Sequence, residues 1–117
     1  MTGSTSYHAG ICAEDLVARQ YSDKGFGLCE KRWRGAAGEI DLIVEDGDTL
    51  VFIEVKKSRD FATAAARVSR RQMQRIYASA DAYLGDTHRG MNTNARFDVA
   101  LVDQHGAVEI LENAFGQ

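Results

Sequence analysis

Two short apolar stretches that carry acidic residues constrain the fold of this chain most. They are Gly38-Glu39-Ile40-Asp41-Leu42-Ile43 and Val51-Phe52-Ile53-Glu54-Val55-Lys56. Both have the residue pattern of β-strands, and the Asp46-Gly47 dipeptide between them predicts a tight turn. A carboxylate inside an apolar strand is expensive to bury unless a cation, a proton or a partner compensates it. The hairpin therefore predicts a polar site that contains Asp41, Glu54 and Lys56.

The remaining pattern predicts one α/β domain over residues 1–117, with the element order αβββαβ. Residues 1–6 are expected to be mobile, and residues 60–68 to form a loop or a frayed helical approach. A helix between the third and fourth strands makes those two strands parallel, whereas the first three form an antiparallel meander. The result is a mixed sheet of four to five strands with helices packed against it. The expected helices are 7–24 and 69–84, and the expected strands are 26–33, 39–44, 49–57, 96–102 and 108–111.

The turn fixes how the acids face each other. A two-residue loop at Asp46-Gly47 places Phe52 opposite Asp41, and Glu54 then lies diagonal to Asp41 on the same face, about 7–8 Å away at Cα. Lys56 shares that face because strand side chains alternate. Two carboxylates suit a hard divalent cation such as Mg²⁺ or Mn²⁺, which would polarise a phosphate and acidify a bound water. Lys56 would orient that water or stabilise the developing charge. Glu14, on the first helix, is a candidate further acid.

The same residues have simpler structural interpretations. Lys56 would form an ordinary ion pair with Glu54 or Asp41 at a solvated sheet face, and exposed pairs of that kind contribute little stability. Glu14 would be an ordinary helix acid. Gln72 would complete a capping box with Ser69 rather than contact a ligand. Spacing alone leaves these alternatives open.

Positive charge is concentrated in one part of an acidic chain. The net charge is −3, so bulk charge does not favour binding to a polyanion. The region from residue 56 to residue 75 is nevertheless basic, with Asp60 as its one acid. It predicts a surface that follows a phosphate backbone, unless it is only a solvated helix face. Its cations are Lys56, Lys57, Arg59, Arg67, Arg70, Arg71 and Arg75, and Arg32 and Arg34 of the first strand are candidate additions.

Composition excludes several other classes of protein. The sequence has neither an apolar run long enough to span a bilayer nor a secretory signal at its start, which favours the cytoplasm. Cys12 and Cys29 form no CxxC pair and are expected to be reduced thiols. The three histidines, His8, His88 and His105, lack the spacing of a zinc site. No small-molecule cofactor and no membrane partner are expected.

The chain resembles a known family over nearly its whole length. The strongest similarity lies in the GEIDLI and VFIEVK blocks, residues 38–43 and 51–56, which together are quite specific. On these residues the chain resembles the YraN-like bacterial proteins of the PD-(D/E)XK nuclease superfamily. Further matching segments are Ala13-Glu14-Asp15, Trp33, Ala80-x-x-Tyr83-Leu84, Arg96-Phe97-Asp98-Val99 and Glu112-Asn113-Ala114-Phe115.

The resemblance implies a restriction-endonuclease-like fold, similar to that of archaeal Holliday-junction resolvases. It implies that Asp41 and Glu54 bind the metal, that the backbone carbonyl of Val55 adds a ligand, and that Lys56 assists the chemistry. Glu14 would complete the acidic site.

Three positions depart from the family pattern. Arg32 stands where the family usually has Asn, Ser58 stands where it has Arg, and Gln72 lies near where it has Lys. The acids and the lysine of the site are intact. These departures alter the residues that would hold nucleic acid, and so affect the type of substrate.

Three hypotheses follow. In the first, the protein is a Mg²⁺- or Mn²⁺-dependent endonuclease that acts on DNA, with branched or damaged DNA as candidate substrates. In the second, it is a nucleic-acid-binding or protein-docking module with a degenerate site. In the third, the acids and Lys56 are structural ion pairs. The oligomeric state is open, with a homodimer as one alternative. The residues predicted to bind DNA are Arg32, Arg34, Lys57, Arg59, Arg70, Arg71, Gln72 and Arg75.

Overall fold

The computed structural model describes the backbone of residues 2–87 and 93–114, and the side chains of residues 13–87 and 93–114. It confirms the αβββαβ order and adds a short helix between the third strand and the long crossover helix. The five strands form one sheet in the order β1-β2-β3-β4-β5, in which only β3 and β4 are parallel. The elements are α1 (Thr2–Asp23), β1 (Gly27–Gly35), β2 (Gly38–Asp46), β3 (Thr49–Lys57), α2 (Phe61–Ala66), α3 (Arg70–Asp86), β4 (Asn94–Val102) and β5 (Val108–Leu111).

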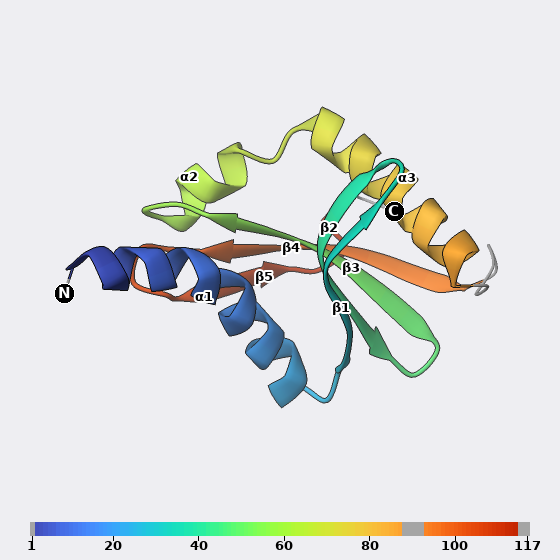
Figure 1. Ribbon diagram of the computed structural model, residues 1–117, viewed down its shortest axis with the longest axis horizontal. Helices are drawn as coiled ribbons and strands as arrows, with labels where there is room; N and C mark the ends of the chain where they lie inside the picture. The colour runs from blue at the N-terminus through green and yellow to red at the C-terminus, as the bar shows by residue number, and fades with distance from the viewer. Residues whose placement is uncertain (1, 88–92, 115–117) are drawn as a thin grey trace.

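The sheet lies between two helical layers, with α1 on one face and α2 and α3 on the other (Figure 1). On the α1 face, Val17 and Tyr21 pack against Leu42 and Ile53, all essentially inaccessible to solvent. On the opposite face, α3 packs over the first three strands. There Ile76, Ala80, Tyr83 and Leu84 of α3 join Ile40, Ile43, Leu50, Phe52 and Phe97. Burial on both faces explains why β3 reads as a nearly continuous apolar run.

The helix ends follow local chemistry. Gly25 has the expected left-handed conformation (φ 96°), and the Phe26 N–H donates to the Tyr21 carbonyl at 3.1 Å, which closes the end of α1. The predicted capping box of Ser69 and Gln72 is confirmed at the start of α3. The first helix begins at Thr2 rather than near residue 7. Whether residues 1–6 are mobile stays a prediction.

Of the two forms predicted for residues 60–68, a loop or a frayed helical approach, the structure has the helical one, because residues Phe61–Ala66 form α2. Asp60 caps this helix by accepting a hydrogen bond from the Thr63 N–H at 2.7 Å. Ala64 is fully buried against Val99 and Leu101 of β4, so tertiary packing selects a helix where the sequence shows no clean period.

The register of the β2–β3 hairpin also differs from the prediction. Asp46 pairs with Thr49, so the two-residue loop is Gly47-Asp48, with Gly47 at φ 60°. Leu42 then pairs with Ile53, which aligns Asp41 with Glu54 directly rather than diagonally. The register is shifted by two positions, and a shift of two keeps every side chain on its expected face.

A buried ionic network joins α1, β4 and the segment after β5. Asp98, which is fully buried, accepts two hydrogen bonds from Arg96 at 3.0 Å and one from the Tyr21 hydroxyl at 2.6 Å. The Asn113 N–H donates to the same carboxylate at 3.0 Å. Burial and this hydrogen bond to Asp98 raise the pKa of Tyr21. A buried carboxylate so fully paired is structural rather than reactive.

Some predicted features lie outside the described residues. They are the side chains of His8 and Cys12, and the residues His88 and Phe115. Within the described part of the chain, no helix is long and apolar enough to cross a membrane.

Candidate functional site

The candidate site lies where β2 and β3 separate. Their pairing ends at Leu42 and Ile53, after which β2 continues beside β1 and β3 continues beside β4. At the fork, the Val55 N–H donates to the Asp41 Oδ2 atom at 2.9 Å. A side chain of β2 thus replaces its backbone as the acceptor for β3. The apolar strands around it hold this carboxylate within the sheet.

Asp41 and Glu54 meet at this fork. Burial, followed by the negative charge of Glu54, raises the pKa of Asp41 to about 7, although the Val55 N–H partly offsets the effect. The two carboxyl groups are close enough to hydrogen-bond when one of them carries a proton, and the charge of Glu14 adds a smaller repulsion. Two acids in this arrangement lack full compensation within the chain.

Lys56 is the third member of the site. Its Nζ lies 3.1 Å from Glu54 Oε2, and both side chains are more than four-fifths buried, with exposures of 17% and 14%. The prediction that Asp41, Glu54 and Lys56 share one face of the hairpin is in keeping with the observed register. Lys56 neutralises Glu54 and leaves its Nζ beside the acidic pair.

Glu14 occupies a different position from the one expected of a shared ligand. Its Oε1 atom accepts a hydrogen bond from Arg32 Nε at 2.6 Å, across the gap between α1 and β1. Its charge reaches Asp41, so it lies near the site, but its carboxylate is bound to the guanidinium.

A hollow of about 190 Å³ opens beside the acids on the α3 side of the sheet. Gln72 and Arg75 of α3 form its helical wall, so Gln72 both caps the helix and lines the hollow. Gly38 allows α3 to approach, because a Cβ there would lie 3.1 Å from Arg75 and 3.2 Å from Ser79 Oγ. The lining residues are Gly38, Glu39, Asp41, Glu54, Gln72, Arg75 and Ile76.

The donor set fits a hard divalent cation in part. Asp41 and Glu54 provide two carboxylates whose mutual repulsion a cation would relieve. Among the side chains that the structure describes, no three His, Cys, Asp or Glu residues form a group suited to hold a metal ion. The set is therefore a two-carboxylate site with Glu14 engaged elsewhere, and a Val55 carbonyl ligand stays a prediction.

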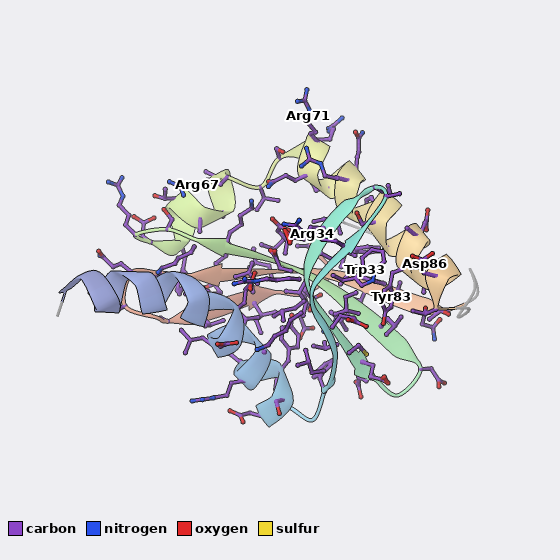
Figure 2. All side chains as sticks on the ribbon, viewed as in Figure 1. Trp33, Arg34, Arg67, Arg71, Tyr83 and Asp86 are labelled. Carbon is purple, nitrogen blue, oxygen red and sulfur yellow. The ribbon has the colours of Figure 1, made fainter. Side chains whose placement is uncertain are left out.

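The predicted basic residues come from β1 and from the segment that runs from the end of β3 through α2 into α3. Arg67 and Arg71 lie with α2 and α3, where Arg71 points outward, and Arg34 lies on the β1–β2 hairpin (Figure 2). Arg70, Arg71 and Arg75 are exposed. Others are engaged locally: Arg34 with Glu39 at 3.3 Å, Arg59 with Asp60 at 3.5 Å, and Arg67 with the Lys57 carbonyl at 3.4 Å.

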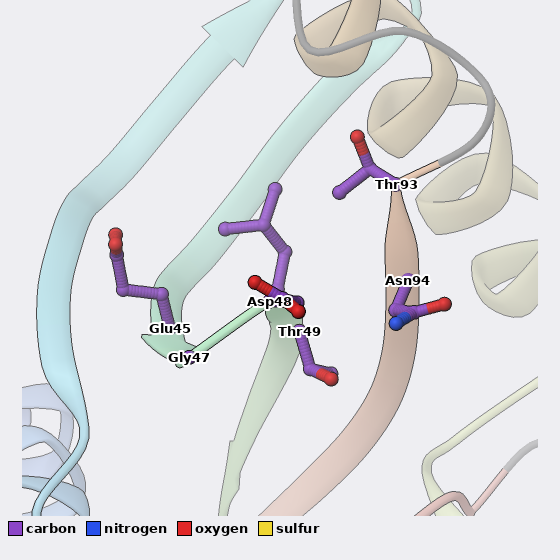
Figure 3. Close-up of a pocket in the computed structure, with 7 residues that line it drawn as sticks. Glu45, Gly47, Asp48, Thr49, Thr93 and Asn94 are labelled. Atoms are coloured by element: carbon purple, nitrogen blue, oxygen red, sulfur yellow. The ribbon is translucent and has the colours of Figure 1, made fainter.

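A larger hollow, of about 440 Å³, lies at the opposite end of the hairpin (Figure 3). It is lined by Glu45, Gly47, Asp48, Thr49, Leu50, Thr93 and Asn94. Five residues of strand, about 17 Å, separate the turn from Asp41. This hollow contains neither the paired acids nor Lys56, and it lacks a basic side chain among its lining residues.

Sequence reasoning did not assign three of the lining residues to the site, namely Gly38, Glu39 and Ile76. The signal for Glu39 was present, because it precedes Asp41 by two positions in a strand and so belongs to the same face. The role of Gly38 depends on the approach of α3, which no local pattern shows.

Comparison with known proteins places these features in a family. A model of the family described as "Uncharacterised protein family UPF0102" matches residues 13–102. A UPF0102 protein of Cereibacter sphaeroides strain KD131 is 57% identical over 115 residues, which covers 98% of each chain. One from Ruegeria pomeroyi is 52% identical over 114 residues, covering 97% of this chain and 93% of the relative. One from Dinoroseobacter shibae is 39% identical over 111 residues, covering 95% and 83%.

Proposed function

We propose that this chain, which belongs to the UPF0102 family, is a metal-dependent nuclease that hydrolyses phosphodiester bonds in DNA, with branched or damaged DNA as candidate substrates. One observation carries the proposal: the half-buried carboxylate of Asp41 is fixed beside Glu54 at the fork of two strands. A fold that served stability alone would gain by replacing such a repulsive pair.

Asp41 and Glu54 are the residues that would hold Mg²⁺ or Mn²⁺, together with the Val55 carbonyl. The bound ion would supply Lewis acidity toward the phosphate and a more acidic water. Val55 keeps the Asp41 carboxylate in place through its N–H. Lys56, already beside Glu54, would donate a hydrogen bond to the attacking water or to a phosphate oxygen.

The surrounding charge supports a polyanionic substrate. Arg70, Arg71 and Arg75 are exposed on α3, and Arg75 also lines the hollow that contains the acids. These exposed cations would bind the phosphate backbone of a nucleic acid while one of its phosphodiester bonds reaches the acids.

One observation favours the second candidate, a nucleic-acid-binding or protein-docking module without hydrolysis. Three acids in or near the site are already paired with cations of the same chain: Glu14 with Arg32, Glu39 with Arg34, and Glu54 with Lys56. Each pair opposes the binding of a further cation. In that function the site would be degenerate, and only the basic surface would act.

The deciding experiment incubates the purified protein with linear, single-stranded and branched DNA in Mg²⁺, Mn²⁺ or EDTA. We expect metal-dependent cleavage of at least one substrate, and a loss of about 100-fold or more in Asp41→Asn and Lys56→Met. Lys31→Met is the matched control, because it removes an exposed lysine whose partner is Asp15 on α1. Binding without cleavage would support the module instead. Equal cleavage by all preparations would indicate a contaminating nuclease and overturn the proposal.

A further inference from the structure

Two consecutive residues of β1 bind two consecutive residues of α1. Lys31 Nζ lies 2.5 Å from Asp15 Oδ1, and Arg32 Nε lies 2.6 Å from Glu14 Oε1. In a regular strand, consecutive side chains point to opposite faces, so one helix would meet only one of them. The strand is therefore irregular at this point.

The irregularity is in the backbone of Arg32, whose φ is 51°. A left-handed conformation is uncommon for a residue with a long side chain, and such positions persist only when the surroundings hold them. Arg32 lies between Lys31, which pairs with Leu42, and Trp33, which pairs with Ile40. That places it across from Asp41. The left-handed backbone of Arg32 breaks the alternation of side chains along β1, so its side chain points toward α1, as that of Lys31 does.

We propose that Arg32 is a positioning residue that holds Glu14 out of the metal site, so that the resting protein has two carboxylate ligands and gains a third when Arg32 releases Glu14. The inference rests on the proposed function. Glu14 is mostly buried, with 18% of its side chain exposed, and it is bound by Arg32, whose side chain is 57% exposed.

The electrostatic surroundings of Arg32 fit this role. Its hydrogen bond with Glu14 and the charge of Glu14 raise the pKa of Arg32, and the charges of Glu39 and Asp41 act in the same direction. The guanidinium thus stands where acids from α1 and β2 converge. An approaching cation, or a substrate phosphate that draws Arg32 away, would compete for the same space. Because affinity for hard cations rises with the number of charged oxygen ligands, release of Glu14 would strengthen the site.

The test is titration of Mn²⁺ into the full chain by calorimetry, with variants at both partners. Arg32→Asn removes the cation, is too short to reach Glu14, and suits a left-handed backbone. We expect it to bind Mn²⁺ on the order of tenfold more tightly than the wild type. Glu14→Gln alone should weaken Mn²⁺ binding only slightly, because it removes a nearby negative charge and leaves Arg32 uncompensated but removes no resting ligand. In the Arg32→Asn background, the same change should remove the gain.

Lys31→Asn is the matched control for loss of a positive charge. It is one residue away, contacts the same helix and pairs with an acid outside the site. We expect it to leave Mn²⁺ affinity unchanged. If it tightens binding as much as Arg32→Asn does, the effect is bulk charge and the proposal fails. Arg32→Gly, which also suits a positive φ, provides a second variant if the asparagine protein folds poorly.

The outcomes separate this inference from the proposed function. If no variant binds Mn²⁺, the metal site itself is wrong and both proposals fail. If the wild type binds Mn²⁺ and Arg32→Asn does not tighten that binding, Arg32 does not hold a ligand away from the site. Only the role of Arg32 is then overturned.

Discussion

The carboxylate of Asp41 accepts a hydrogen bond from the backbone N–H of Val55 at 2.9 Å, at the point where β2 and β3 stop pairing. The residue proposed to bind a cation is therefore also the hydrogen-bond acceptor for the Val55 N–H, which has lost its backbone partner on β2. A substitution that keeps the acceptor but removes the charge separates these two roles, because Asn can still accept from Val55 through its side-chain oxygen.

Asp41→Asn should leave the metal-free protein equally stable or more stable than the wild type at pH 8. The substitution removes the repulsion from Glu54, and we expect a gain of about 1–2 kcal/mol in the free energy of unfolding. Mg²⁺ or Mn²⁺ should raise the melting temperature of the wild type and have little effect on the variant. Thermal melts with EDTA or with added metal measure both effects.

The ion-pair interpretation predicts the opposite sign. If the positive charge of Lys56 is neutralised by Asp41, removing the charge of Asp41 leaves a buried cation without a counter-ion. That loss would cost about 3–5 kcal/mol in the free energy of unfolding. A strongly destabilised Asp41→Asn protein, together with a wild type that gains nothing from metal, would end the nuclease proposal.

The stability of the metal-free protein should also depend on pH through Asp41. Burial and Glu54 raise the pKa of Asp41 to about 7 in the folded state, from a usual value of 3.8. The folded state then binds more protons than the unfolded state between these values. The stabilisation is fully present below pH about 4 and is lost as the pH rises through 7.

Urea unfolding in EDTA at pH 5, 6, 7 and 8 measures this effect. We expect the wild type to lose about 1–3 kcal/mol relative to Asp41→Asn between pH 5 and 8, a range reduced for the solvent that reaches this half-buried group. The comparison with the variant removes the contribution of other groups that titrate in this window. Parallel curves would show that Asp41 titrates near its ordinary pKa.

The hairpin shows which parts of the site the sequence could predict. The shared face of Asp41 and Glu54 followed from strand alternation, which requires only that the register be correct to an even number of positions. Their direct alignment did not follow, because Asp46-Gly47 and Gly47-Asp48 are both acceptable two-residue turns. The turn chosen, with Gly47 at φ 60°, shifts the register by two positions and brings the carboxylates closer.

The position of Glu14 could not be predicted from the sequence for a different reason. Arginine has no preference for the left-handed conformation, so nothing local predicts φ 51° at Arg32. The side chain of Arg32 instead binds Glu14, which lies on α1, 18 residues earlier in the chain. Sequence patterns report local preference and alternation, whereas this feature arises from tertiary contact.

Arg70→Ala combined with Arg71→Ala should weaken DNA binding and reduce its salt dependence. Both side chains are exposed at the start of α3. If each contacts one phosphate, the slope of log affinity against log salt concentration should fall by about two. Fluorescence anisotropy at several salt concentrations, in Ca²⁺ or EDTA to prevent cleavage, gives the slope.

The control for that experiment is Arg19→Ala combined with Lys24→Ala. These cations are exposed at the end of α1 and just after it, on the other side of the sheet from α3 (Figure 1). The control removes the same charge and should change affinity much less. If both double variants behave alike, or neither changes the slope, the surface of α3 does not follow the DNA backbone.

Gly38→Ala should destabilise the fold and disturb the site. Gly38 has φ 147°, and a Cβ there would lie 3.1 Å from two side-chain carbons of Arg75 and 3.2 Å from Ser79 Oγ. We expect a loss of about 1–3 kcal/mol in the free energy of unfolding, measured in urea with EDTA. Because the side chains of Arg75 and Ser79 would have to shift, and Arg75 lines the hollow that contains Asp41, Mn²⁺ affinity should also fall. Gly27→Ala is the matched control, since its added Cβ would meet its nearest neighbour, Glu45 Cγ, at an ordinary 3.6 Å. Equal stability and equal Mn²⁺ affinity in the two variants would show that the close approach of α3 at Gly38 does not shape the site.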